Sequence, residues 1–138
     1  ARERLYALSR RVGAGDLVFL TGDSHSFWAN RLADAAGRPA GVELGTSGIT
    51  SPGDFIGSGF DRALSEKLDR ALEEHNPEVV WTDNLHNGYV RLELARRAAR
   101  ASFVAVDIAR PGAYRPLTIK RATLRRKAGV LALAVTEP

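Results

Sequence analysis

Apolar residues recur at two spacings along this chain, and each spacing predicts one kind of secondary structure. Residues 60–74 repeat apolar side chains every three or four positions with charged residues between them, which predicts an amphipathic helix. Residues 89–94 alternate, which indicates a half-buried strand with Val90, Leu92 and Leu94 pointing inward. The remaining predicted elements are a helix over 1–13, a turn at 14–16, and strands at 78–82, 101–106, 117–124 and 130–135.

The first third of the chain predicts a strand, a helix and a second strand. Leu17–Leu20 is an unbroken apolar run, typical of a strand buried on both faces. Residues 26–36 carry a partial apolar stripe that ends at Gly37, which favours a helix, and Gly41–Leu44 is a short strand. This order suggests a parallel strand pair joined by a right-handed crossover. The predicted fold class is α/β with α+β character, an early β-α-β unit followed by mostly antiparallel strands, in a single domain or domain fragment over residues 1–138.

Composition narrows the class of protein without identifying it. The 138 residues include no Cys, which excludes disulfides and thiolate metal sites, and no apolar run reaches the ~20 residues of a membrane-spanning helix. The chain also has no Met, so we expect a segment of a longer protein or a processed product. Its net charge is +4, with the densest basic run at residues 115–127. That run indicates either a solvated surface or a basic module that binds nucleic acid or another polyanion.

The residues with the clearest chemistry follow the first strand. Gly22 allows the chain to turn, and Asp23 and His25 come directly after it. On an extended chain, side chains two residues apart point the same way and start ~6.5–7 Å apart, so this pair could bind one metal ion or two neighbouring ones. Carboxylate and imidazole ligands suit Fe, Mn, Zn or, on the carboxylate side, Ca. The alternative is an Asp that caps a turn beside an exposed His.

Weaker candidates for contacts with a substrate are Ser24, Asn30, Thr46, Ser47 and His86. The helix predicted to begin near Ser24 would favour an anion such as phosphate at its N-terminus, and the alternative for this hydroxyl is helix capping. Asn30 is equally consistent with a surface position. The hydroxyls of the Gly-rich loop at residues 45–59 could line a phosphate site or bond their own backbone. His86 pairs with Asp83 in a turn that is either solvated or part of the substrate rim.

A longer stretch around Asp23 and His25 resembles a known family. Residues 20–30 read Leu-Thr-Gly-Asp-Ser-His-Ser-Phe-Trp-Ala-Asn. They resemble the Gly-Asp-x-His-Ser-x-Trp segment of the PhoD-type alkaline phosphatases, which belong to the binuclear metallophosphoesterase superfamily. The resemblance covers most of residues 16–107 and is less distinct over 108–138. Its further segments are residues 42–53, 76–77, 81–84, 87–94 and 101–107.

The resemblance implies a fold and an activity. The family has a four-layer αββα sandwich, of which this chain would be the C-terminal half. It hydrolyses phosphate mono- and diesters by attack of a metal-bound hydroxide on phosphorus. Asp23 would bind the calcium side and His25 the iron side of a binuclear Fe³⁺ and Ca²⁺ centre, with Zn²⁺ or Mn²⁺ as alternative metals. The intact protein would be an extracytoplasmic, secreted enzyme.

The family's other metal ligands lie upstream of the segments that this chain resembles. We therefore expect this segment alone to be inactive, and to need the missing N-terminal part of the same domain as its partner. We also expect it to expose apolar surface where that part packs. Two alternatives stay open: a basic module for nucleic acid or another polyanion, and a non-catalytic scaffold fragment. In the enzyme interpretation, nucleic acid is a partner only as a phosphate-ester substrate.

Overall fold

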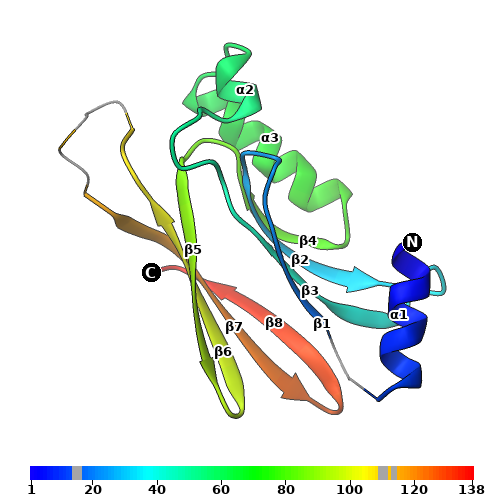
Figure 1. Cartoon of the computed structure of the whole chain (residues 1–138). Coiled ribbons are helices and arrows are strands. Elements are labelled where there is room, and N and C mark those ends of the chain that lie inside the picture. Colours follow the sequence, from blue (N-terminus) through cyan, green and yellow to red (C-terminus); the bar gives the residue numbers. More distant parts are fainter. Residues whose placement is uncertain (14–16, 109–111, 113–114) are drawn as a thin grey trace.

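Two four-stranded sheets pack face to face and form the core of the described chain (Figure 1). The computed structural model describes residues 1–13, 17–108, 112 and 115–138. Sheet A is mixed and has the strand order β1-β3-β2-β4. Sheet B is an antiparallel meander with the order β5-β6-β7-β8.

The direction of the strands in sheet A decides which loops meet. Its strands are β1 (Leu17–Thr21), β2 (Phe27–Ala33), β3 (Pro39–Gly45) and β4 (Val79–Asp83). β1 is parallel to β3, and β2 is antiparallel to both β3 and β4. The carboxyl ends of β1, β3 and β4 therefore lie at the same edge of the sheet, where β2 begins. Loops that follow carboxyl ends are where α/β sheets bind ligands.

Sheet B supplies the other half of the core. Its strands are β5 (Gly88–Ala95), β6 (Ala98–Ala105), β7 (Leu117–Lys127) and β8 (Val130–Thr136). Phe27 of sheet A and Phe103 of sheet B are fully buried, and their ring centroids lie 5.7 Å apart. Trp81 packs on Phe103 with centroids 4.7 Å apart, so aromatic rings join the two sheets at the centre. The other buried members of this cluster are Ala29, Val42, Leu44, Ala101, Ala122, Leu124 and Leu133.

Helices α1 and α3 lie on the side of sheet A that faces away from sheet B (Figure 1). Helix α1 (Arg2–Arg11) buries Tyr6, which packs edge-on against Phe19 of β1 with ring centroids 6.4 Å apart. Helix α3 (Arg62–His75) packs on β4, where its Glu73 carboxylate accepts a hydrogen bond from the Thr82 N–H at 3.1 Å. A single turn, α2 (Asp54–Gly57), lies in the Gly-rich loop. Among the described residues, no helix is long and apolar enough to cross a membrane.

Several predicted elements are confirmed. The helix predicted over 60–74 is α3, and the helix predicted over 1–13 is α1. The strands predicted after residue 77 correspond to β4 through β8, and each is antiparallel to its neighbours, β4 in sheet A and the other four in sheet B. The pairing of the first strand with the 41–44 segment is parallel, as expected. The predicted turn at 14–16 lies outside the described residues.

Three predictions about the chain are wrong. The segment 26–36 contains strand β2 (Phe27–Ala33) and no helix, so the early β-α-β unit does not exist and β2 itself lies between β3 and β4. The Leu17–Leu20 strand is not buried on both faces, because β1 is an edge strand in which Val18 is 42% and Leu20 62% exposed. Leu94 is 78% exposed near the end of β5, beyond the part of the strand that the core covers.

Candidate functional site

The turn at residues 22–26 joins β1 to β2 at the carboxyl edge of sheet A. Asp23 and His25 both have left-handed backbone conformations there, with φ of 75° and 51°. Such conformations are uncommon outside glycine and cluster at functional sites, although Asp and His adopt them more readily than most residues. The Asp23 side chain is exposed and His25 is half-buried. Because this segment is not extended, strand alternation does not set the directions of the two side chains.

The turn has no helix behind it. β2 begins at Phe27, so the helix N-terminus expected near Ser24 is absent and its dipole cannot attract an anion. The Ser24 hydroxyl instead accepts a hydrogen bond from the indole N–H of Trp28 at 2.9 Å. This bond fixes Trp28 beside the turn and leaves the hydroxyl proton of Ser24 available to another acceptor.

The loop after β3 is held against this turn by Ser47. The Ser47 hydroxyl lies 2.8 Å from the carbonyl oxygen of His86 and 3.2 Å from that of His25. Ser47 is 6% exposed, so its hydroxyl ties two loops together and does not face solvent. The neighbouring Thr46 bonds backbone as well, through its hydroxyl to the Ser47 carbonyl at 3.4 Å and through its N–H to Thr21. These contacts agree with the backbone-bonding alternative for the loop hydroxyls.

Asn87 and Gly53 let the same loop approach closely. The Asn87 amide donates to the carbonyl oxygens of Gly48, at 2.7 Å, and of Ser51. A Cβ atom at Gly53 would lie 3.1 Å from the His25 carbonyl oxygen and 3.4 Å from that of Asn84. A larger residue at this position would therefore push the loop away from the His25 turn. Three strand-end segments, residues 22–26, 46–53 and 84–87, thus meet at one edge of sheet A.

Asp54 is a site residue that the sequence did not single out. Its Oδ1 lies 3.5 Å from His25 Nδ1, and Asp54 is the first residue of α2. A carboxylate beside one imidazole nitrogen is the usual arrangement around a metal-binding His, whose other nitrogen then binds the metal. Asp54 is the acidic residue of the Gly-rich loop at 45–59, and a search for a carboxylate partner for His25 would have found it.

The Asp83–His86 pair forms an ordered turn after β4. Asp83 Oδ2 lies 2.8 Å from His86 Nδ1, and Asp83 Oδ1 accepts from the backbone N–H groups of His86 and Leu85. Burial raises the pKa of Asp83, but the hydrogen bonds and charge of His86 outweigh it, so the net pKa of Asp83 is lowered. His86 is therefore oriented by a carboxylate, with a third of its side chain exposed. The Ser47 hydroxyl lies within hydrogen-bond distance of the carbonyl oxygens of both His86 and His25, so the turn after β4 and the turn at residues 22–26 belong to one cluster.

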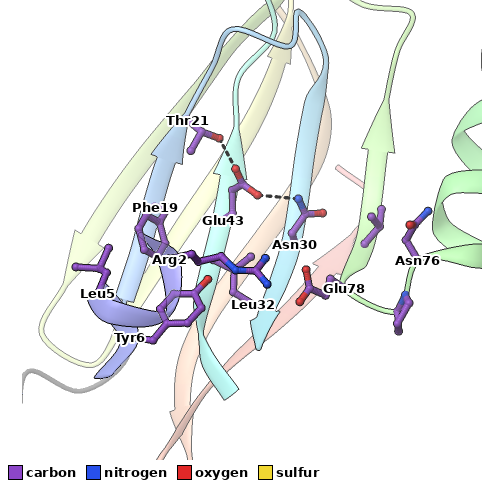
Figure 2. A pocket seen from close by; sticks show the side chains of 12 residues that line it. Arg2, Leu5, Tyr6, Phe19, Thr21, Asn30, Leu32, Glu43, Asn76 and Glu78 are labelled. Atoms are coloured by element: carbon purple, nitrogen blue, oxygen red, sulfur yellow. Dashed lines mark hydrogen bonds between the residues drawn. The ribbon is translucent and has the colours of Figure 1, made fainter. Parts of the chain in front are cut away.

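The structure does not bring Asn30 to the turn. Asn30 lies within β2, and its amide donates to Glu43 Oε2 at 2.9 Å, while the Thr21 hydroxyl donates to Glu43 Oε1 at 2.8 Å (Figure 2). These side chains line a cavity of about 650 Å³ whose wall includes Leu5 and Tyr6 of α1. The cavity lies on the helix-covered face of sheet A, and its lining includes no residue of the 22–26 turn.

The donors at the turn fit a metal centre only in part. Asp23 offers carboxylate oxygens and His25 an imidazole nitrogen, which suit the metals of phosphoester hydrolysis. Within the described part of the chain, no three His, Asp or Glu side chains gather closely enough to hold a metal ion. Asp23 and His25 could thus supply at most two ligands, and a complete metal site would need others.

The basic run at residues 115–127 belongs to sheet B. Most of it lies on β7, where Ala122 and Leu124 are buried in the core. Arg121 and Arg125 are exposed and occupy alternate positions to those two residues, so they point to the outer face of the sheet. The basic residues are thus on another sheet from the Asp23–His25 turn.

Comparison with known proteins gives one family and one structure. The PhoD-like phosphatase family model matches residues 1–103. A solved structure described as "Structure of PhoD" superposes with a TM-score of 0.71 at 17% sequence identity. The match covers 99% of this chain and 25% of that chain, so this chain spans about a quarter of the solved structure and shares its fold over that part. No curated protein matches the sequence.

Proposed function

This chain belongs to the PhoD-like phosphatase family, and we propose that it forms part of a metal-dependent enzyme that hydrolyses phosphate mono- and diesters. The observation that carries the proposal is the meeting of three strand-end segments around Asp23 and His25. They lie at the carboxyl edge of a mixed sheet, where ligand sites of α/β proteins are built. The left-handed backbone of both residues adds support, because strained conformations persist where function requires them.

Asp23 and His25 would each hold one cation of a binuclear centre, with calcium on the Asp23 side and iron on the His25 side. Asp54 would orient His25 through Nδ1 and leave Nε2 for the metal. When bound, such cations activate water and withdraw charge from phosphoryl oxygens. The remaining ligands would come from another part of the protein, so we propose that these 138 residues are inactive on their own.

Other residues of the cluster would position the substrate and the turn. His86, oriented by Asp83, would lie on the substrate rim beside the phosphate ester. Ser24 would contribute its remaining hydroxyl proton. The buried Ser47 would hold the His25 turn and the His86 turn in register without contacting substrate.

The exposed side of β1 would bind the rest of the domain. Val18 and Leu20 pair in register with the buried Val42 and Leu44, so they lie on the core side of sheet A although they are 42% and 62% exposed. Exposed apolar side chains on an edge strand are typical of an interaction surface. An upstream part of the same domain packed here would extend sheet A and complete a four-layer αββα sandwich. The intact enzyme would act outside the cytoplasm, as the family resemblance implies.

Hydrolysis by the longest natural chain that contains these residues tests the proposal. We expect turnover of p-nitrophenyl phosphate or its bis ester, abolished by EDTA and lowered at least about 100-fold by Asp23→Ala or His25→Ala. His75→Ala is the matched control, because this exposed His ends α3 away from the turn. Full activity of His25→Ala would contradict the proposal. Salt-sensitive binding of nucleic acid without hydrolysis would instead favour a basic module.

A further inference from the structure

A chain of hydrogen bonds runs from helix α3 through the buried Asn84 and Ser26 side chains to the Asp23–His25 turn. Asp69 of α3 accepts from the Asn84 side-chain amide at 2.5 Å and from the Asn84 backbone N–H at 3.1 Å. The carbonyl oxygen of the same amide accepts from the Ser26 hydroxyl at 2.6 Å. Asn84 and Ser26 are each 1% exposed, so water does not compete for the bond between them.

The chemistry of the Asn84 side chain fixes its orientation. An amide has a donor end and an acceptor end, and here the donor end faces a carboxylate while the acceptor end faces a hydroxyl. Reversing the amide would place its oxygen against the carboxylate of Asp69 and break both bonds. Because Asp69 also holds the backbone of Asn84, it fixes both the position and the direction of this side chain.

Ser26 carries this constraint into the turn. Its hydroxyl lies 3.2 Å from the carbonyl oxygen of Ser24, so it contacts the chain on the other side of His25. The hydroxyl therefore closes a small loop around the residue that we propose as a metal ligand. A left-handed His needs such support, because the conformation costs free energy that the surroundings must offset.

We propose that Asp69 is a positioning residue that acts through Asn84 and Ser26 to hold the Asp23–His25 turn in its metal-binding conformation. The inference rests on the proposed function, since it assigns Asp69 to the same site. It adds a residue 44 positions after His25 in the sequence, on a helix that supplies no ligand.

The surroundings of Asp69 support a role beyond holding the helix in place. Burial raises the pKa of Asp69 to about 6, and the charges of Asp83 and Glu73 act in the same direction, against the hydrogen bonds from Asn84. The ionised carboxylate is thus maintained at a cost in stability, which proteins accept most often at functional sites. Glu73, one turn away, accepts a hydrogen bond from the backbone N–H of Thr82 in β4 and offers a comparison on the same helix.

The test compares Asp69→Ala with Glu73→Ala in the longest natural chain. Mn²⁺ affinity is measured by electron paramagnetic resonance, kcat and KM with p-nitrophenyl phosphate, and folding by thermal unfolding in EDTA. We expect Asp69→Ala to lower Mn²⁺ affinity and kcat at least about tenfold with little change in KM. Glu73→Ala should lower the unfolding temperature and leave Mn²⁺ affinity and kcat within about twofold of wild type.

A swapped double variant decides the case even where Asp69→Ala does not fold. Asn84→Asp alone places two carboxylates next to each other and should lower Mn²⁺ affinity. The double variant Asp69→Asn with Asn84→Asp restores an amide–carboxylate pair and should recover most of the Mn²⁺ affinity. Equal losses in the single and double variants, or unchanged Mn²⁺ affinity in Asp69→Ala, would overturn the inference while wild type still binds Mn²⁺. A wild type that neither binds Mn²⁺ nor hydrolyses ester would overturn the proposed function as well.

Discussion

Replacing Asp69 by Asn should change the stability of the 138-residue chain in a way that depends on pH. Burial raises the pKa of Asp69 from its ordinary value of 3.8 to about 6 in the folded protein. Between these two values the folded state holds a proton that the unfolded state has released. Stability therefore falls as pH rises through this window, because the unfolded state binds fewer protons. Asp69→Asn removes the titration and with it this fall.

The size of the effect follows from the two pKa values. Their difference corresponds to about 3 kcal/mol, of which about 2 kcal/mol develops between about pH 4 and about pH 7.5. Asp69 is only half-buried, so solvent screening reduces the measurable change to about 1 kcal/mol. The free energy of unfolding of Asp69→Asn, taken relative to wild type, should thus be about 1 kcal/mol higher at pH 7.5 than at pH 4. The bonds to Asn84 contribute at both pH values and do not change this difference.

Urea unfolding followed by tryptophan fluorescence at the two pH values measures this difference. Glu66→Gln is the matched control, because Glu66 is an exposed acid on the same helix, 3.6 Å from Arg62. For Glu66→Gln, the free energy of unfolding relative to wild type should change by no more than a few tenths of a kcal/mol between the two pH values. The same free-energy difference between wild type and Asp69→Asn at both pH values would refute the reasoning.

Three further predictions concern the core and the loops around the site. Phe103→Ala should destabilise the chain by about 3–5 kcal/mol in urea unfolding, because the ring joins the two sheets; a loss below about 1 kcal/mol would contradict that role. Asp83→Asn should lower the free energy of unfolding by about 1–3 kcal/mol at neutral pH. Because the pKa of Asp83 is lowered in the folded state, this loss should shrink as pH falls below 3.8, the ordinary pKa of an Asp. A loss of stability that does not vary with pH would count against this prediction. Gly45→Ala should lower the free energy of unfolding by about 1–3 kcal/mol and alter tryptophan fluorescence, because the new Cβ would lie 2.9 Å from the Trp28 ring. Gly57→Ala is the control, because its new Cβ would meet no atom within 4 Å, and it should leave the fluorescence unchanged.

Elements with a clear local pattern were predictable from the sequence. α3 has charged and apolar residues at helical spacing and an Asp61 cap, so its sequence and its packing agree. β7 and β8 alternate and are separated by Gly129, whose φ of 83° suits a tight turn. In these segments the local pattern and the tertiary environment favour the same structure.

β2 shows where local pattern misleads. The segment after Trp28 is rich in Ala, Leu and Arg, which favour helices, and it lacks β-branched residues. It is nevertheless a strand, because it fills the space between β3 and β4 and buries Phe27 and Ala29 on one face. Tertiary pairing outweighs helix propensity here, and because Trp28 between Phe27 and Ala29 is also apolar, the sequence shows no alternation that would mark the strand.

The site was predictable only where it is local in sequence. Asp23 and His25 follow a strand and a glycine, so their place at the carboxyl end of that strand could be predicted. The contact of His25 with Asp54 and the bond of Ser26 to Asn84 join residues 29 and 58 positions apart, and they depend on how the loops fold together. The same dependence separated Asn30 from the turn, because its direction on β2 follows from the strand and not from a helix.

Metal content tests the central claim, that Asp23 and His25 are ligands of a metal centre, most directly. The longest natural chain containing these residues would be loaded with Fe and Ca, desalted, and analysed by inductively coupled plasma mass spectrometry. The account predicts bound metal at a fixed ratio to protein in wild type and in His75→Ala, with Fe lost in His25→Ala and Ca lost in Asp23→Ala. Wild-type metal content in both ligand variants would contradict it.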